Sequence, residues 1–363
     1  MNILVLNYEY PPLGGGGASV CKDLCQIARE NGNNIEVVTM LYKGMAEKED
    51  VKGIIVHRVK CLRTSQRVCH PLEQFTYCIL AYKYIKKNID VDNFDLIHCH
   101  FIIPTGLLAM WLKRKYRIKY IITAHGSDVL GHNNVRFGFL YKIVRPIWIE
   151  ILQVADSITA PSAYLVNKIK EFYPTSKCIC IPNGIYVKEY HGVKKKKSII
   201  TLSRLQESKG IQDLIEACSE IELVDWEVNI LGDGPYKENL EKLVKNKKLQ
   251  DKIFFRGHVT GDERIQYLSE AGIFFSGSHF EAFPLSVLEA SLSGCNIIAS
   301  NIEPHVMLVG DKHIYRNQDE LKKMLIYALN NEPQIYQYGN EKFDWNVIYD
   351  QYMRLFESVI RER

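Results

Sequence analysis

Residues 279–294 read HFEAFPLSVLEASLSG, and two glutamates in this stretch, Glu281 and Glu289, have seven residues between them. Pro284 lies between the glutamates at a position that suits the first turn of a helix, because the N–H group that proline lacks is unpaired there in any residue. Apolar residues at helical spacing follow it, and Gly294 suits a C-terminal cap. The pattern therefore predicts that Glu281 lies in a loop and that Glu289 lies on the helix after it.

A short buried strand is predicted directly before this loop, at residues 272–276. An open α/β sheet binds its ligands where strands end and helices begin. The start of a helix offers unpaired N–H groups and a positive dipole end to an anion such as a phosphate. Glu281 and Glu289 can then each hold a pair of sugar hydroxyls. For this stretch alone, a core helix with two solvated glutamates is an equal alternative.

The composition fits a folded protein of two α/β domains. The chain has 363 residues, of which 47% are hydrophobic and 24% charged, and this excludes a disordered protein. The formal net charge of +4 is small for this length, so no nucleic acid partner is expected. The ten cysteines form no zinc-type cluster, and no apolar run reaches the roughly 20 residues of a transmembrane helix. We expect a cytoplasmic protein with reduced thiols.

A glycine-rich loop follows the first predicted strand. It contains four consecutive glycines, Gly14, Gly15, Gly16 and Gly17, and a helix is predicted after it at residues 20–31. Glycine allows the backbone to approach a ligand closely. The loop is not a dinucleotide fingerprint, because no glycine follows at the spacing that Gly-x-Gly-x-x-Gly requires. A flexible surface turn is the alternative, and it is less favoured because turns seldom need four consecutive glycines.

Histidines occur in or directly after two further predicted strands. His98 and His100 share one face of the first of these strands. His125 follows the second strand, with Asp128 close behind it, and the carboxyl end of a strand is where open α/β sheets bind ligands. His98 and His100 are either zinc ligands or histidines that are buried or line an acceptor site. No third zinc ligand is apparent, which favours the second interpretation.

A second set of strands and helices starts at residue 198. Its first loop carries Arg204 and Lys209, and two cations between a strand and a helix can converge on a pyrophosphate. The next two strands are followed by Gly232 and Gly234, and by His258 and Val259. This half of the chain is therefore expected to bind a phosphorylated ligand.

Three segments are basic: residues 51–67, 113–119 and 194–197. In the second segment basic residues alternate with aromatic ones, which suits an anionic membrane surface, and a solvated helix end is an equal alternative. Residues 58–67 of the first segment are a second candidate for contact with this surface. The lysines at 194–197 are interpreted as a solvated run at a domain boundary.

The stretch at residues 279–294 resembles the Glu-x7-Glu signature of retaining GT-B glycosyltransferases, in particular glycosyltransferase family 4. Other segments resemble motifs of this family in the family's order, namely the glycine-rich loop, Thr-x-His-Gly-x-Asp around His125, Arg-x4-Lys-Gly from Arg204 and Gly-x-Gly-Pro from Gly232. No single motif is decisive, but the ordered set covers essentially the whole chain.

The resemblance implies a GT-B fold, in which two Rossmann-like domains face each other across a cleft. It implies an acceptor-binding domain at residues 1–190, a nucleotide-sugar-binding domain at 191–342, and a helix at 343–363 that returns to the first domain. The implied reaction moves a sugar from a nucleotide sugar, with uridine as the commonest base, to a hydroxyl of a sugar, glycan or lipid-linked acceptor, with retention of configuration. No metal or cofactor is implied. The protein is expected to be cytoplasmic or peripheral on the inner face of the cell membrane.

The resemblance also implies residue roles. Arg204 and Lys209 stabilise the departing diphosphate. Glu281 binds the sugar hydroxyls, Glu289 binds the ribose diol, and His125 orients the sugar. The other implied donor-binding residues are Gly16, Gly17, Gly232, Gly234, His258, Val259, Phe283, Pro284 and Leu285. The implied acceptor side consists of Gly14, Gly15, His100 and Asp128.

Two other functions fit the same fold. A non-hydrolysing nucleotide-sugar 2-epimerase would act without an acceptor and would produce an isomeric nucleotide sugar. A non-catalytic nucleotide-sugar-binding protein would bind the donor without turnover. The presence of all the residue types expected at the active site weighs against the second.

Overall fold

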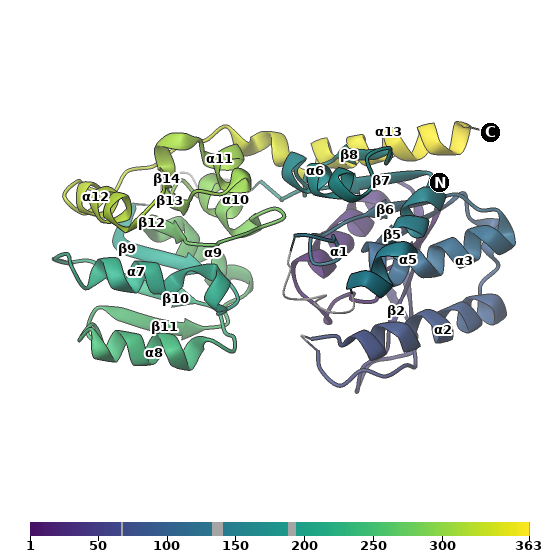
Figure 1. Cartoon of the computed structure of the whole chain (residues 1–363), viewed down its shortest axis with the longest axis horizontal. Helices are drawn as coiled ribbons and strands as arrows, with labels where there is room; N and C mark the ends of the chain where they lie inside the picture. The colour runs from purple at the N-terminus through teal and green to yellow at the C-terminus, as the bar shows by residue number, and fades with distance from the viewer. Residues whose placement is uncertain (67, 133–140, 188–193, 363) are drawn as a thin grey trace. The chain divides into compact units, whose positions relative to one another are not determined.

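The structure is a computed structural model that describes residues 1–66, 68–132, 141–187 and 194–362. The chain divides into two compact units, which are described separately (Figure 1). Unit 1 comprises Met1–Gly184 and Phe343–Arg363, and unit 2 comprises Ile185–Lys342. The predicted boundary between residues 190 and 191 lies outside the described residues.

Unit 1 is built on an eight-stranded sheet in the order β3-β4-β2-β1-β5-β6-β7-β8. All neighbouring strands are parallel except the β3–β4 pair. The strands are β1 (Asn2–Leu6), β2 (Asn34–Met40), β3 (Lys48–Val51), β4 (Ile54–Val59), β5 (Leu96–His100), β6 (Tyr120–Thr123), β7 (Ser157–Ala160) and β8 (Cys178–Cys180). Near-continuous runs of buried residues in β1 and β5 are what a sheet covered on both faces requires.

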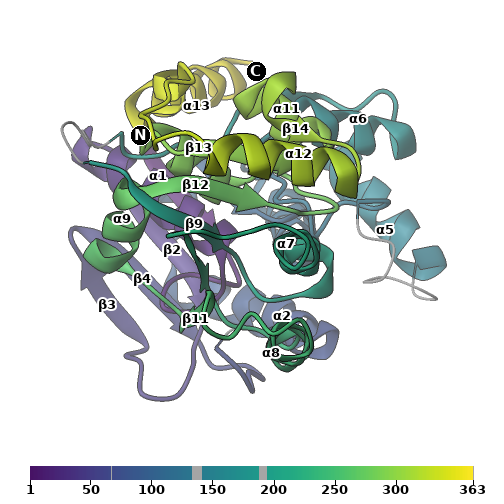
Figure 2. The same ribbon diagram turned by 90° about the vertical axis from the view of Figure 1, so that its left-hand side faces the viewer.

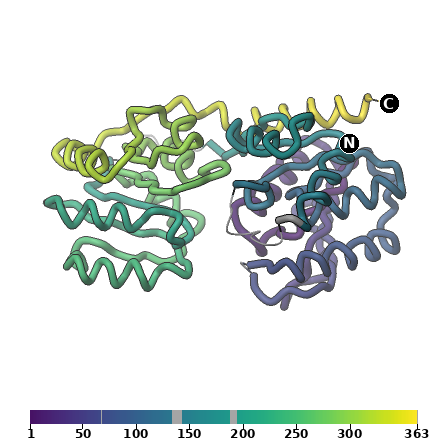
Figure 3. The backbone as a smooth tube through the Cα atoms, viewed as in Figure 1, coloured from purple at the N-terminus to yellow at the C-terminus, as the bar shows by residue number. Residues whose placement is uncertain are grey.

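Helices cover both faces of this sheet. The helix α1 packs on α13, and α3 packs on α2 and α5. The helices are α1 (Gly16–Glu30), α2 (Pro71–Asn88), α3 (Leu107–Tyr116), α5 (Tyr141–Val154), α6 (Ala163–Phe172) and α13 (Trp345–Arg361). Figure 3 shows the chain re-entering unit 1 as α13, at the yellow end of the colour scale.

The helix α13 joins unit 1 through an apolar stripe. Its buried residues include Trp345, Ile348, Tyr352 and Phe356, at the spacing of one helical face. The side-chain amide of Asn33 also donates a hydrogen bond to the Tyr349 hydroxyl across 2.9 Å. The last helix of the chain is therefore part of the core of unit 1.

Unit 2 is built on a six-stranded parallel sheet in the order β11-β10-β9-β12-β13-β14. The strands are β9 (Lys196–Leu202), β10 (Glu227–Leu231), β11 (Ile253–Gly257), β12 (Ala271–Ser276), β13 (Asn296–Ser300) and β14 (Ile314–Tyr315). The helices are α7 (Ile211–Cys218), α8 (Lys237–Asn246), α9 (Gly261–Glu270), α10 (Leu285–Leu292), α11 (Glu303–Val309) and α12 (Gln318–Leu329). Figure 2 shows α7, α8 and α12 along one face of the sheet, where they enclose a core that includes Ile199, Leu214, Phe275 and Leu321.

The basic segment at residues 51–67 is a charged surface only in part, since Lys52 and Lys60 are exposed but two of its arginines are buried. It contains most of the hairpin of β3 and β4, which the sequence pattern did not reveal because β3 is largely charged. Arg58 is buried and pairs with Glu49 across 2.7 Å, and Arg63 is buried and pairs with Glu9 across 3.2 Å. These arginines therefore cannot contact a membrane. Arg67 lies outside the described residues.

The lysine run at residues 194–197 is only partly solvated, since Lys194 and Lys196 are exposed and Lys195 is not. Lys195 is buried, and its ammonium group donates to the carbonyl oxygens of Ser269 and Ser293 across 2.8 and 2.6 Å. Lys196 begins β9 and pairs with Glu270. The interpretation as a solvated run is wrong for Lys195, because the run enters the sheet of unit 2 and distant carbonyl groups accept hydrogen bonds from the Lys195 ammonium group.

Candidate functional site

Two loops of unit 2 lie side by side because their strands are neighbours. The strands β9 and β12 pair in parallel, so the loops at their carboxyl ends meet at one edge of the sheet. The backbones touch where Gly210 meets Gly277: Gly210 has φ +63°, and a Cβ there would overlap the Gly277 carbonyl oxygen. The His279 N–H also donates to the Ser208 carbonyl across 2.9 Å. A side chain at Gly210 would therefore push the two loops apart.

This contact brings Lys209 and Glu281 together. The Lys209 ammonium lies 2.5 Å from Glu281 Oε1, and the Ser278 hydroxyl donates to the same oxygen across 2.8 Å. Burial raises the pKa of the Glu281 carboxyl, but Lys209 and the hydrogen bonds from Lys209 and Ser278 outweigh it and hold that pKa below its ordinary value. Glu281 is therefore ionised at neutral pH. Its loop position was predicted, whereas its pairing with Lys209 was not.

Arg204 lies in the same loop as Lys209 but is exposed. Among the described residues, Arg204 forms no ion pair. Its loop is held by hydrogen bonds from the Ser203 N–H to the Leu231 carbonyl and from the Leu205 N–H to the Asp233 carbonyl. An exposed guanidinium on a fixed loop can bind a phosphate bidentately. That Arg204 and Lys209 converge on one diphosphate stays a prediction.

Gly232 and Gly234 are close-packing positions. A Cβ on Gly232 would overlap the Ser203 carbonyl oxygen, and a Cβ on Gly234 would overlap that of Leu205. The two glycines thus hold the Arg204 loop against the turn after β10. Whether they also contact a ligand stays a prediction.

Glu289 lies on α10, as predicted, and pairs with Arg264 of α9. The Arg264 Nη2 donates to Glu289 Oε2, while the Arg264 Nε is buried with no hydrogen-bond partner among the described residues. Arg264 was not recognised from the sequence, because nothing in its local pattern distinguishes it from other surface arginines of a helix.

The remaining predicted donor-binding residues lie near these loops in sequence. His258 is exposed and Val259 is buried directly after β11, and Phe283 is buried beside α10. The helix α10 begins at Leu285 and not at Pro284, whose ψ of 83° is not helical. The Pro284 carbonyl accepts hydrogen bonds from the N–H groups of Val287 and Leu288, so Pro284 is the N-cap and not the first helical residue.

In unit 1 the glycine-rich stretch is only partly a loop. Gly14 has φ +91°, and its N–H donates to the Gln66 carbonyl. Gly15 is the N-cap of α1, and Gly16 and Gly17 form the first turn of the helix, which starts four residues earlier than predicted. The helix was predicted to start later because glycine is a poor helix former. Tertiary contacts of the first turn stabilise it in spite of this low helix propensity.

The ring of His125 rests on this helix start. A Cβ on Gly17 would lie 2.7 Å from the ring of Phe101 and 3.2 Å from Cγ of His125. The ring centroids of Phe101 and His125 are 4.5 Å apart. The sheet order β2-β1-β5-β6 explains why Gly17, Phe101 and His125 are in contact, since the loops after β1, β5 and β6 are neighbours. A side chain at residue 17 would therefore displace the ring of Phe101 and crowd that of His125.

Asp128 and His100 are buried, unlike residues that line an open acceptor site. The two carboxylate oxygens of Asp128 accept hydrogen bonds from the backbone N–H groups of His125 and Ile102, across 3.0 and 2.7 Å. The Nδ1 atom of His100 lies 3.0 Å from Nε2 of His125. Asp128 thus fixes the backbone at His125, and His100 contacts the His125 ring. Because both are buried, direct contact of either residue with an acceptor is not favoured.

Among the described residues, no group of three or more His, Cys, Asp or Glu residues could hold a metal ion. His98 is buried and bonded to the Thr123 hydroxyl across 2.8 Å. His98 and His100 are therefore buried histidines, and the described residues offer them no further zinc ligand.

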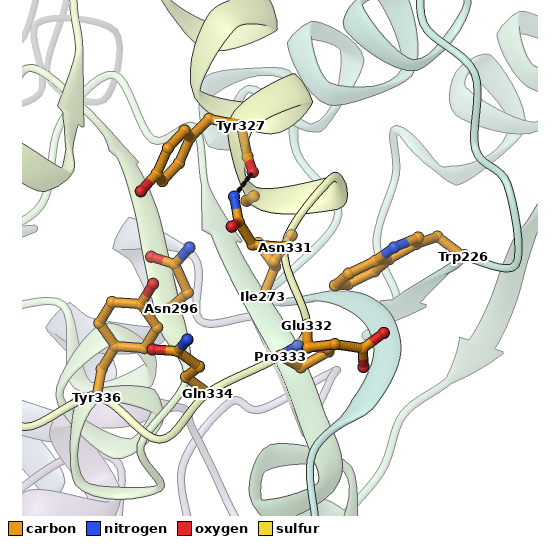
Figure 4. Close-up of a pocket in the computed structure, with 11 residues that line it drawn as sticks. Trp226, Ile273, Asn296, Tyr327, Asn331, Glu332, Pro333, Gln334 and Tyr336 are labelled. Atoms are coloured by element: carbon orange, nitrogen blue, oxygen red, sulfur yellow. Dashed lines mark hydrogen bonds between the residues drawn. The ribbon is translucent and has the colours of Figure 1, made fainter.

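A pocket exists in unit 2, at the edge of the sheet opposite the loops of Lys209 and Glu281. It is lined by Ile273 and Asn296 near the amino ends of β12 and β13, and by Tyr327 and Tyr336 (Figure 4). The candidate site at the carboxyl edge does not include it.

Comparisons with known proteins agree on one family. The family model "Glycosyltransferase Family 4" matches residues 14–189, and the model "Glycosyl transferases group 1" matches residues 186–344. The N-acetyl-alpha-D-glucosaminyl L-malate synthase of Bacillus anthracis is 25% identical over 97% of this chain and 96% of its own length. The alpha-monoglucosyldiacylglycerol synthase of Streptococcus pneumoniae is 24% identical over 92% of this chain and 79% of its own.

Solved structures agree on the fold. The sucrose-phosphate synthase of Thermosynechococcus elongatus matches with a TM-score of 0.84 at 16% identity, over 100% of both chains. HepE of Anabaena in complex with UDP-glucose matches with a TM-score of 0.76 at 16% identity, over 99% of this chain and 100% of its own. The predicted GT-B fold is confirmed.

Proposed function

Because this chain belongs to the family 4 glycosyltransferases of GT-B fold, we propose that it transfers a sugar from a nucleotide sugar to an acceptor hydroxyl with retention of configuration. The observation that carries the proposal is the Lys209–Glu281 pair at the carboxyl edge of the unit 2 sheet. It brings the ionised carboxylate of Glu281 against Lys209, in the loop that also carries Arg204. A cation for the diphosphate and a carboxylate for the sugar are what such a donor needs.

The proposed donor is a UDP-sugar. The neighbour HepE binds UDP-glucose in its solved structure, and this chain has a matching fold over its whole length. In the proposed mode Glu289, held by Arg264, accepts the ribose hydroxyls, and Glu281 accepts sugar hydroxyls. Lys209 and Arg204 neutralise the charge that the diphosphate gains as it departs.

The proposed chemistry uses no protein nucleophile. The acceptor hydroxyl attacks the anomeric carbon on the face that the diphosphate leaves, and the leaving phosphate oxygen takes its proton. His125 orients the sugar. Since burial lowers the pKa of His125 to about 3, its ring is neutral at physiological pH and acts as a hydrogen-bonding group.

The proposed acceptor class is a sugar, glycan or lipid-linked hydroxyl of the cell envelope. Among the relatives, one is named as a synthase of a glucosaminyl malate and one as a synthase of a glucosyl diacylglycerol. Both names describe a sugar joined to a hydroxyl compound, and the second describes a glycolipid.

A panel of nucleotide sugars tests the function. We expect one donor to raise the unfolding midpoint, since a ligand at 100 times its dissociation constant adds roughly 2.7 kcal/mol of stability. The same donor should be hydrolysed slowly alone and faster with an acceptor, and the product should keep the anomeric configuration. An isomeric nucleotide sugar would identify an epimerase instead. Binding without any turnover across acceptors would identify a binding protein.

We expect activity to survive an excess of chelator, because Lys209 and Arg204 supply the positive charge at the diphosphate. Initial rates of donor hydrolysis with and without EDTA make the measurement. A metal-dependent enzyme assayed alongside shows that the chelator is effective. A complete loss of rate that magnesium or manganese restores would contradict this prediction.

We further propose that unit 1 works at the cytoplasmic face of a membrane. None of the described helices is long and apolar enough to cross a bilayer. In the segment at residues 113–119, Lys113 pairs with Asp156 and Arg114 with Glu150, so two of its five basic side chains already have an acidic partner. Apolar side chains at the start of α2 offer a better contact, with Leu72 65% and Phe75 55% exposed. Leu62, 52% exposed, lies beside them, because its N–H donates to Thr76.

We expect the double substitution Leu72→Ser and Phe75→Ser to weaken binding to lipid vesicles by at least about tenfold. Burying one large apolar side chain contributes roughly 1.5–3 kcal/mol, and 1.4 kcal/mol is a factor of ten. The measurement is co-sedimentation with anionic and with neutral vesicles. Ile326→Ser with Tyr327→Ser, on exposed apolar residues of α12, is the matched control. Unchanged binding in the α2 variant, or no binding by the parent, would remove the proposal.

A further inference from the structure

Three histidines of unit 1 lie ring to ring. The ring centroids of His98 and His100 are 4.4 Å apart, and those of His100 and His125 are 5.2 Å apart with an interplanar angle of 16°. Burial lowers the pKa of His98 and of His125 to about 3 and that of His100 well below its ordinary value. Each ring is therefore neutral and carries one N–H, on either Nδ1 or Nε2.

One hydrogen bond links the proton positions of two of these rings. His100 Nδ1 and His125 Nε2 are 3.0 Å apart, so one of the two nitrogens donates and the other accepts. If His100 donates from Nδ1, the proton of His125 must be on Nδ1. If His125 donates from Nε2, the proton of His100 must be on its own Nε2.

The surroundings of His100 decide between the two arrangements. Its Nε2 is buried and has no hydrogen-bond partner among the described residues. A buried N–H without an acceptor is rare, while acceptors that lack a donor are more often tolerated. His100 therefore carries its proton on Nδ1 and donates it to His125 Nε2, and His125 carries its proton on Nδ1.

The Nδ1 atom of His125 lies close to the first turn of α1. A Cβ on Gly17 would lie 3.3 Å from this nitrogen. The N–H groups of Gly16 and Gly17 open the helix, and no acceptor for them exists among the described residues. With a proton on Nδ1, His125 adds a third donor to this place, which then suits an oxygen that only accepts hydrogen bonds.

We propose that His100 is a positioning residue that fixes His125 as the Nδ1–H tautomer, so that His125 donates a hydrogen bond to an oxygen atom of the substrate and takes no proton from it. The identity of that oxygen, a sugar hydroxyl or a donor phosphate, rests on the proposed function. The tautomer itself does not. His98 is bonded to Thr123 and does not share in the link.

The test is nitrogen NMR of the full chain labelled with ¹⁵N-histidine. Protonated and unprotonated ring nitrogens differ strongly in chemical shift, and comparison with His125→Gln assigns the signals of His125. We expect Nδ1 of His125 to be protonated and Nε2 to be unprotonated across pH 5–8. A proton on Nε2 in the parent protein would overturn the proposal, whether or not the protein transfers sugar.

Two substitutions extend the test to activity. In His100→Asn the side-chain amide can donate as Nδ1 does, so the tautomer and kcat should stay close to those of the parent. In His100→Leu nothing donates to His125 Nε2, so the Nδ1–H tautomer is no longer fixed. Signals of both tautomers should then appear, and kcat should fall a few-fold with KM nearly unchanged. A fall in kcat with an unchanged His125 tautomer would mean that His100 is merely structural. If His100→Leu does not fold, the parent and His100→Asn spectra still decide. Absence of transferase activity in the parent would sink the proposed function and leave the tautomer result standing.

Discussion

Replacing Lys209 with methionine is expected to lower kcat/KM for sugar transfer by about 10²–10³. The Lys209 ammonium lies in the loop at the carboxyl end of β9 and is 20% exposed, so it acts in a partly water-excluded place. Loss of one preorganised group that stabilises developing charge typically costs about this factor. In the parent, the departing diphosphate gains negative charge and Lys209 offsets it. In the variant only Arg204 remains for this task.

The comparison needs controls because Lys209 also pairs with Glu281. Lys209→Arg keeps the charge, and it should recover part of the rate. Lys242→Met removes an exposed lysine of α8 and should leave the rate unchanged. Steady-state kinetics on the three variants, with thermal unfolding to confirm the fold, makes the measurement. If Lys209→Met stays within threefold of the parent, the assignment of Lys209 to the diphosphate is wrong.

Glu281→Gln and Glu289→Gln are expected to separate turnover from nucleotide binding. Glu289 is assigned to the ribose diol, and hydrogen bonds to a charged group are worth roughly 1.5–3 kcal/mol each. Glu289→Gln should therefore lower the affinity for the bare nucleoside diphosphate by at least about tenfold. Glu281→Gln should lose turnover about 100-fold while the bare diphosphate binds as well as before or more tightly.

The sign of the Glu281 effect follows from its ion pair. In the free protein Glu281 Oε1 is 2.5 Å from the Lys209 ammonium, so an arriving diphosphate competes with Glu281 for the same cation. Removing the carboxylate charge relieves that competition. Calorimetry with the diphosphate and single-turnover rates with the full donor measure both quantities. If both substitutions lower the affinity for the diphosphate equally, the division of roles is wrong. If neither variant changes this affinity or the rate, neither glutamate takes part in donor binding.

Much of the secondary structure follows from local pattern. The strand at residues 272–276, the loop of Glu281 and the helix with Glu289 lie where the apolar spacing predicts them, as β12, the loop after it and α10. Gly294 has φ +74° after the end of α10, as a C-terminal cap requires. Such features depend on residues within a few positions of each other, so a single sequence contains them.

The errors arise where tertiary contacts override local pattern. The hairpin of β3 and β4 was missed because β3 is largely charged and exposed, while its pairing with β4 and the ion pair of the buried Arg58 with Glu49 hold it in the sheet. The charged residues around Lys195 predict an exposed side chain. It is buried instead, and its ammonium group donates hydrogen bonds to two carbonyl groups that are distant in the sequence. Gly16 and Gly17 are helical because the chain around them holds the first turn of α1.

The sequence by itself determined which residue types stand at which strand ends, and with them the α/β class, the family and the candidate residues of each loop. Only the tertiary structure decided which of these residues meet. Lys209 meets Glu281 because β9 and β12 are neighbours although β10 and β11 separate them in the chain. His100 supports His125 because β5 and β6 pair in register. Strand order and the packing of whole sheets set these contacts, and neither is encoded in the few residues around each site.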